Sequence, residues 1–309
     1  MKPFSAFVLA TAFLLAPLAA QPASAQTPPA VAKINAYVGC INRLSERAYD
    51  SRKRYFSWVG RNGPTGRERI IYGTYTIYNT ADCKNNVEKA NAMEPRDAAI
   101  EAAATAYVAA VTALEPLLKE ADDYYTQQNY KDDRMAKGRA LHPRLVGAWN
   151  AFAAADQRLR AEVEAINDRR ALEKLAEIEK HEGKKTPYYI QALMIHAKRV
   201  LRTQETGKPD LGALTQALAD FEAAVKGAEQ ASSAGNGPKL GSFFMNNAKS
   251  YLVTGKQLMR RIRDHVPYSS GDRMMLANHL SGWMVEGSPP RLLRDYNQLV
   301  DSYNRGPGI

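Results

Sequence analysis

The sequence is poor in the residues that mark familiar catalytic and metal sites. Among 309 residues there are 2 cysteines, Cys40 and Cys83, which are too far apart for a C-x-x-C redox or zinc motif. The 5 histidines form no H-E-x-x-H pattern, and the G-x-S-x-G turn of serine hydrolases is absent. We therefore expect no metal and no cofactor, and no catalytic residue can be named.

Long apolar runs are also missing beyond the N-terminus. The chain starts with the charged Lys2, an apolar stretch from Phe4 to Ala16 and the small-residue sequence Ala23-Ser24-Ala25, a pattern typical of a cleaved secretory signal. No later segment has the roughly 18 uninterrupted apolar residues of a membrane-spanning helix. We expect a mature chain that begins near Gln26, has no transmembrane segment, and lies in the periplasm or is secreted.

Acidic residues are too few to balance the basic ones. Lys and Arg number 42 and Asp and Glu 32, a formal net charge of +10, and from Lys184 to Ile309 there are 17 basic residues against 10 acidic ones. Dispersed charges of this kind are typical of a solvated surface, but they also create a field that attracts anionic partners. Nucleic acid is not an expected partner, because the chain is predicted to be exported.

Apolar residues recur at steps of three and four along most of the chain, which predicts helices. Four long helices are expected at about residues 30–59, 68–93, 95–125 and 134–182, and shorter ones follow to residue 304. The predicted fold is all-α, an antiparallel up-and-down bundle with long helices. We expect a signal peptide at residues 1–25, a four-helix bundle at 26–185 and a C-terminal helical part packed on it at 186–309.

The second predicted helix is the least regular of the four. Its first half, Ile70 to Tyr78, is rich in β-branched and aromatic residues and resembles a strand. A helix is preferred because an isolated strand would have no partner for its backbone. The third helix is expected to start at Pro95, since proline is accepted in a first helical turn.

The two cysteines are placed to form a disulfide. Cys40 and Cys83 lie at nearly equal distances from a turn at Arg61 and Asn62. In an antiparallel helical hairpin the two thiols would therefore reach the same height. Because the predicted compartment is oxidising, we expect this disulfide to form.

Acidic and aromatic residues are concentrated between the third and fourth predicted helices. Oxygen ligands of this kind suit a hard cation, but the spacing fits no calcium loop, and Asp132 or Asp133 is better explained as a cap of the fourth helix. Asp156 lies further along, on an apolar seam, where either a drift of the helix face exposes it or it pairs with an Arg, His or Tyr from another helix. The candidate ligand-binding residues are Tyr124, Tyr125, Tyr130, Asp132, Asp133, His142 and Asp156.

Three blocks of sequence form a recognisable set, namely Lys33-Ile34-Asn35-Ala36-Tyr37 to Cys40, Tyr55-Phe56-Ser57-Trp58 with Gly63-Pro64-Thr65-Gly66, and Tyr124-Tyr125 to Leu141-His142. Together they resemble the YiiG-like family of bacterial envelope proteins, whose function is unknown. The resemblance implies a helical, exported protein and assigns no activity, substrate or catalytic residue. Many members are lipoproteins, whereas this chain has no Cys at its predicted cleavage site.

Three functions stay open on these grounds. The residues favour a non-enzymatic binding or structural module of the cell envelope, whose partner would be an envelope protein. A hydrolytic or metal-dependent enzyme with a site near residues 122–142 is the second hypothesis. The third is binding of an anionic envelope polymer or lipid through the basic C-terminal half.

Overall fold

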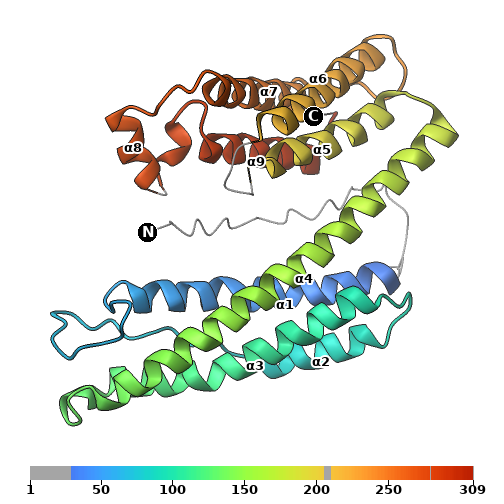
Figure 1. Ribbon diagram of the computed structural model, residues 1–309. Coiled ribbons are helices and arrows are strands. Elements are labelled where there is room, and N and C mark those ends of the chain that lie inside the picture. The colour runs from blue at the N-terminus through green and yellow to red at the C-terminus, as the bar shows by residue number, and fades with distance from the viewer. Residues whose placement is uncertain (1–28, 205–209, 279, 309) are drawn as a thin grey trace. The chain divides into compact units, whose positions relative to one another are not determined.

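The computed structural model describes residues 29–204, 210–278 and 280–308, and within them every regular element is helical (Figure 1). The predicted signal peptide lies outside the described residues. The α-helices are α1 (Pro29–Phe56), α2 (Thr80–Asn91), α3 (Ala98–Thr126), α4 (Ala136–Glu182), α5 (Thr186–Arg202), α6 (Leu211–Ser233), α7 (Ser242–Arg263), α8 (Ser270–Ala277) and α9 (Pro289–Arg305). Short 3₁₀ helices form η1 (Asn129–Lys131) and η2 (Gly282–Met284). The predicted all-α fold is confirmed, and the up-and-down order of its helices stays a prediction.

The chain divides into two compact units between Asn167 and Asp168, inside α4. One uninterrupted helix therefore contributes its first part to one unit and its last part to the other. The domain boundary expected near residue 185 stays a prediction. Gly183, with a φ of 74°, follows the last residue of α4, as expected for a helix that ends at a glycine.

The first unit packs α1, α2, α3 and the start of α4 around aromatic and aliphatic side chains. The apolar residues of α3, which recur at steps of three and four, lie in this core. Helix α3 begins at Ala98 and not at Pro95. Asp97 is its N-cap, and its carboxylate accepts hydrogen bonds from the amides of Ala99 at 3.1 Å and Ile100 at 3.5 Å. Fully buried core residues include Tyr37, Ala48, Tyr107, Val111, Leu114, Leu118, Leu145 and Leu159.

Helix α3 is, among the described helices, the one long and apolar enough to cross a membrane by length and composition, with a hydropathy of 1.3. The same helix supplies many of the buried side chains of the first unit, from Ile100 to Tyr125. A helix that is buried in a protein core can have the same length and apolar composition as a membrane-spanning helix. The absence of a transmembrane segment from the mature chain stays a prediction.

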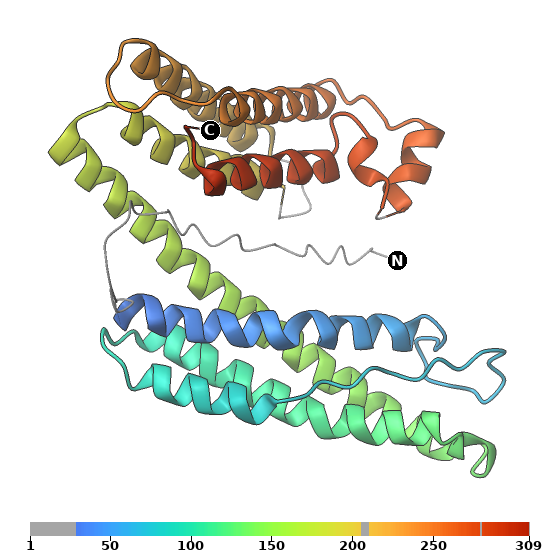
Figure 2. The same cartoon turned by 180° about the vertical axis from the view of Figure 1, so that it is seen from behind.

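The second unit packs α5, α6, α7 and α9 against one another (Figures 1 and 2). Its core is one cluster of aliphatic and aromatic residues contributed by all four helices. The buried Asp295 of α9 is paired inside this unit with Thr254 of α7 at 2.5 Å and Arg291 at 3.3 Å. The largest fully buried side chains here are Phe221, Phe244 and Tyr251.

The helix predicted from Glu68 to Met93 is wrong in its first half. Residues 57–79 contain no helix, and α2 starts only at Thr80. Gly73 has a φ of 68°, a conformation that a helix does not contain. The strand-like composition of Ile70 to Tyr78 was therefore the better guide to the local backbone.

This extended segment satisfies its backbone with side chains of α1 instead of a neighbouring strand. The Ser51 hydroxyl donates to the carbonyl oxygen of Tyr75 at 2.6 Å and accepts from the Tyr75 amide at 3.1 Å. The Arg54 guanidinium donates to the Tyr72 carbonyl at 2.7 Å. An unpaired extended segment is thus stable here because a helix supplies the missing donors and acceptors. Arg47 of α1 donates to the carbonyl of Thr76, and Trp58, which follows α1, donates to the carbonyl of Gly73.

The predicted disulfide between Cys40 and Cys83 is confirmed, with a Cα–Cα distance of 5.3 Å. It joins α1 to α2 and closes a loop across a sequence separation of 43. The two cysteines do not meet across a pair of equally long helices. Helix α2 is short, and the extended segment forms most of the chain that leads back from the turn to Cys83. Both cysteines are buried.

We expect the double substitution Cys40→Ser and Cys83→Ser to lower the free energy of unfolding of the oxidised protein by about 2 to 4 kcal/mol, because the unfolded chain loses its cross-link. Urea unfolding followed by circular dichroism measures this difference. Wild type in dithiothreitol should unfold at the same urea concentration as the double variant. Equal midpoints for oxidised wild type and the double variant would contradict the prediction.

Candidate functional site

The turn between α3 and α4 is organised by the carboxylate of Asp133. It accepts hydrogen bonds from the Tyr124 hydroxyl at 2.8 Å and from the amides of Ala136 at 3.2 Å and Lys137 at 2.9 Å. Desolvation opposes the charged form, but these donors outweigh it and hold the pKa of Asp133 below its usual value. The predicted capping role is confirmed for Asp133, whereas Asp132 is exposed.

The tyrosines of this region belong to a packed aromatic cluster. Tyr125 lies edge-on to Trp58, with ring centroids 5.1 Å apart, and next to Tyr124 at 5.0 Å. Tyr130 lies at 6.5 Å from each of the other two tyrosines. Tyr124 and Tyr125 are buried and Tyr130 is half-buried, so the structure does bring the three predicted tyrosines together.

His142 closes the cluster from α4. Its Nδ1 lies 3.0 Å from the Tyr55 hydroxyl and its Nε2 lies 3.2 Å from the carbonyl oxygen of Arg61. The imidazole therefore ties the end of α1 and the following loop to α4. Gly63 fits against this ring, because a Cβ there would lie 3.1 Å from His142 Cγ and its φ of 93° is strained for other residues.

Burial keeps the tyrosine hydroxyls protonated. Desolvation raises the pKa of Tyr55 to about 12, and it raises the pKa of Tyr124 and of Tyr125 well above the usual value. At neutral pH these groups act as neutral hydrogen-bond donors or acceptors and not as phenolate nucleophiles or bases.

Asp156 is buried and paired, which is one of the two predicted outcomes, but it lies away from the turn. Its carboxylate accepts hydrogen bonds from Ser45 at 2.6 Å, Tyr49 at 3.0 Å and Arg160 at 2.9 Å. Fourteen residues of α4 separate it from His142, which at 1.5 Å per residue is roughly 20 Å along the helix axis. The seven candidate residues therefore do not form a single site.

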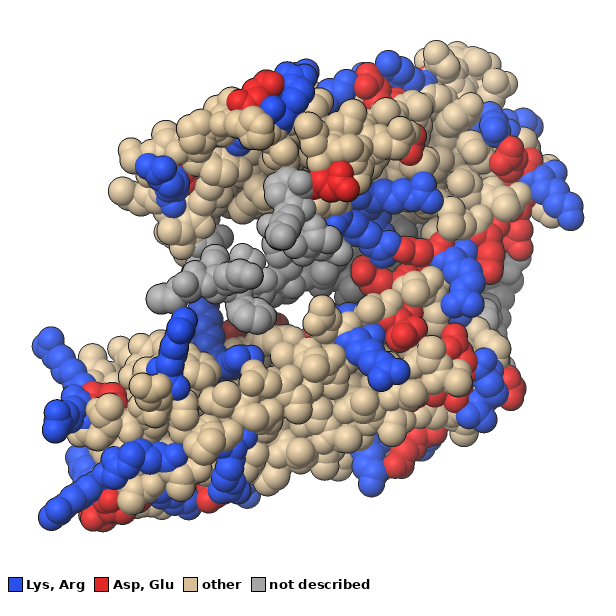
Figure 3. Space-filling view, viewed as in Figure 1, with Lys and Arg blue, Asp and Glu red and all other residues tan. Residues whose placement is uncertain are grey.

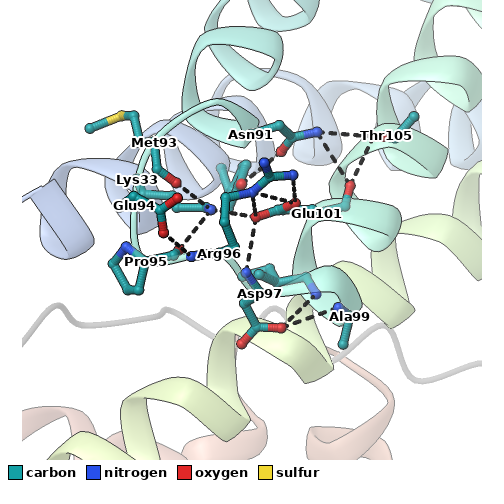
Figure 4. A network of polar contacts seen from close by, with 12 residues as sticks. Lys33, Asn91, Met93, Glu94, Pro95, Arg96, Asp97, Ala99, Glu101 and Thr105 are labelled. Carbon is teal, nitrogen blue, oxygen red and sulfur yellow. Dashed lines mark hydrogen bonds and ion pairs between the residues drawn. The ribbon is translucent and has the colours of Figure 1, made fainter.

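A buried ion pair holds the connection between α2 and α3 (Figure 4). It was not predicted from the sequence. Lys33 is 2% exposed, and its ammonium group donates to Glu101 at 2.6 Å and to the carbonyls of Met93 and Pro95 at 2.9 Å each. An ammonium has three N–H donors, and all three have an acceptor here. Because its donors are satisfied within the protein, Lys33 has a structural role.

Glu101 is held from several directions as well. Arg96 donates to it at 2.7 Å and the Asp97 amide at 2.9 Å. Hydrogen bonds from Arg96 and Lys33 lower the pKa of the Glu101 carboxyl far below its usual value. The signal for this pair was the spacing of Lys33 from Tyr37 and Cys40, steps of four and three that place a lysine on a buried face of α1.

No group of three or more His, Cys, Asp or Glu suited to holding a metal occurs in the part of the chain that the structure describes. Within that part, the acids with low pKa values accept hydrogen bonds from protein donors. The arrangement is a packed aromatic core in which Asp133 and His142 have polar partners, whereas the buried hydroxyl of Tyr125 has no hydrogen-bond partner among the described residues.

The chain matches a known protein family over most of its length. A family model described as "Protein of unknown function (DUF3829)" matches residues 29–305. The chain belongs to this family. The match covers all of the described helices, so family membership extends over both compact units.

A relative supports the same assignment. The chain is 40% identical over 276 residues to the protein named "Uncharacterized protein YiiG" of Escherichia coli (strain K12). The aligned residues cover 88% of this chain and 78% of that protein. The resemblance to the YiiG-like family is thereby confirmed. No solved structure matches the chain with significance.

Replacing Asp156 with Ala should reduce the free energy of unfolding by about 1 to 3 kcal/mol, since buried Ser45 and its neighbours lose their acceptor. Chemical unfolding measures the change. Asp132→Ala is the matched control, because Asp132 is exposed and its removal should change stability by less than about 0.5 kcal/mol. Equal losses in the two variants would contradict the assigned role of Asp156.

The Glu101 pair predicts a loss of stability in acid. The folded-state pKa lies below the ordinary value of 4.5, so the stabilisation is present above pH 4.5 and disappears as the pH falls toward the folded-state pKa. Glu101→Gln should therefore melt at a lower temperature than wild type at neutral pH, and the difference should shrink below pH 4.5. Thermal melts across this range measure it.

The exposed Glu46 provides the control for this measurement. Glu46→Gln should follow the wild-type curve at each pH. A difference between Glu101→Gln and wild type that is the same at neutral and acidic pH would contradict the depressed pKa.

Proposed function

We propose that the chain is an exported, non-enzymatic binding or structural module of the cell envelope. The observation that carries this proposal is that acidic and aromatic groups at the α3–α4 turn form hydrogen bonds to other groups of the protein. Asp133 caps α4 while binding Tyr124, and His142 connects Tyr55 to the Arg61 backbone. These groups hold the fold together and leave little chemistry for a substrate.

An enzyme at residues 122–142 has weaker support for a related reason. General acid–base catalysis needs a group whose pKa lies near the working pH and which reaches the reacting atom. Here burial raises the pKa of Tyr124 and Tyr125, and hydrogen bonds lower the pKa of Asp133. The shifts move all three groups away from neutrality and so favour structural work over catalysis.

Export is supported by the chemistry of the chain. The N-terminal charge, apolar stretch and Ala23-Ser24-Ala25 sequence are typical of a cleaved signal. The disulfide between Cys40 and Cys83 fits an oxidising compartment, where such bonds persist. Together they favour a periplasmic or secreted mature protein.

Expression of the full chain in a Gram-negative host tests the proposal. We expect a mature protein in the periplasmic fraction whose N-terminus, read by mass spectrometry, lies at Gln26 and whose two cysteines are oxidised. Ala23→Asp with Ala25→Asp should keep the precursor mass, because small residues are needed at the cleavage site. Full-length precursor with free thiols in the cytoplasm would overturn export.

A metal screen on the same mature protein tests the non-enzymatic part. Calcium, magnesium and zinc should leave the melting temperature unchanged. A metal that raises the melting temperature in wild type but not in Asp133→Asn would overturn the structural role of the turn in favour of a metal-dependent site.

A further inference from the structure

Residues 266–278 and 280–284, between α7 and α9, form a projection that we call the α8 lobe. Helix α8 has no buried residue, although each of the other α-helices contributes buried side chains. The lobe nevertheless carries large apolar side chains. Four of them are strongly exposed, namely Met274 at 76%, Leu280 at 71%, Val266 at 49% and Met284 at 49%.

The backbone beneath these side chains is held by specific contacts. The Tyr268 hydroxyl donates to the carbonyl oxygen of Gly287 at 3.0 Å, and Ser269 and Asp272 form a capping box at the start of α8. The Ser281 hydroxyl donates to the Met275 carbonyl at 3.1 Å. The apolar groups are therefore displayed on a structured support, and their exposure is a property of the fold.

Basic residues outnumber acidic ones in the lobe and in the helix ends that flank it. Six arginines and four acidic residues lie from Arg260 to Asp295, and two of the acids are paired, Asp264 with Arg263 at 2.7 Å and Asp295 with Arg291 at 3.3 Å. Arg273 is exposed beside Met274 in the sequence. In Figure 3 the part of the surface over α8 is mostly tan, with little red.

Two aromatic side chains of the lobe are covered by arginines of neighbouring helices. The Arg294 guanidinium lies 4.0 Å from the ring centroid of Trp283, and that of Arg261 lies 4.4 Å from Tyr268. Aromatic rings with a polar edge, next to arginine, are typical of the interface between water and lipid. The lobe thus combines the three components of an interfacial surface: aliphatic tips, amphipathic aromatics and positive charge.

We infer that the α8 lobe docks on the anionic surface of a lipid bilayer, with Met274 and Leu280 entering the boundary between headgroups and acyl chains and Arg273 next to lipid phosphates. A second copy of the chain fits the lobe less well, because two such lobes would bring like charges together. A soluble anionic polymer fits less well too, since it has no hydrocarbon interior in which Met and Leu could be buried. This inference rests on the proposed envelope location and adds the surface that meets the membrane.

Vesicle flotation with the full mature chain tests the inference. We expect binding to vesicles that contain equal parts of phosphatidylglycerol and phosphatidylcholine, and much weaker binding to phosphatidylcholine alone. Met274→Ser with Leu280→Ser should weaken the partition constant by about tenfold or more, because two apolar side chains no longer leave water. Val253→Ser is the matched control, since Val253 is 54% exposed but lies on α7 outside the lobe.

The charge component has its own pair of variants. Arg273→Gln should weaken binding to the anionic vesicles by about fivefold, the effect of one basic residue near a charged bilayer. Lys239→Gln removes an exposed positive charge elsewhere in the same unit and should leave binding unchanged. Circular dichroism of each variant shows whether it is folded.

Several results would overturn the inference. These are equal binding to neutral and anionic vesicles, no binding to either, or binding that Met274→Ser with Leu280→Ser leaves intact. Self-association that the same double variant abolishes would assign the lobe to a second copy. Because signal cleavage is measured in cells and vesicle binding on purified protein, normal export with no vesicle binding would reject the lobe and keep the proposed function.

Discussion

Buried polar groups must find their partners inside the protein, and α1 supplies partners to each of the other parts of the first unit. Lys33 binds the connection between α2 and α3, Ser45 binds Asp156 of α4, and Ser51 binds the extended segment at Tyr75. The three residues are at most 2% exposed. A single helix therefore fixes its neighbours through directional contacts as well as through apolar packing, and these contacts define which arrangement of the core is allowed.

Periodicity predicted most of the helices because each one buries an apolar face, and that face is visible in the local sequence. The extended segment before α2 could not be predicted in this way, since its stability depends on side chains of α1 that lie 24 residues away in the case of Ser51 and Tyr75. The pairing of Asp156 was predictable because a carboxylate on an apolar seam needs a partner. Lys33 was missed although its position on a buried face carried the same signal.

The α3–α4 turn, which is rich in acidic and aromatic residues, uses several of them to hold the fold. At the α3–α4 turn, Asp133, Tyr124 and His142 already have protein partners. The α8 lobe is the opposite case, with aliphatic groups such as Met274 that have few contacts of their own. The first region is conspicuous in its composition, whereas the second is conspicuous in the exposure of its apolar side chains. Exposed apolar surface favours binding, because a partner removes that surface from water.

The disulfide has a consequence for the integrity of the molecule. Cys40 and Cys83 bracket the whole extended segment, including the exposed Arg67 and Arg69. A trypsin-like protease outside the cytoplasm that cleaved the backbone at either arginine would produce two pieces still joined by a covalent bond. The chain can thus be cleaved in this exposed segment and remain one molecule until the disulfide is reduced.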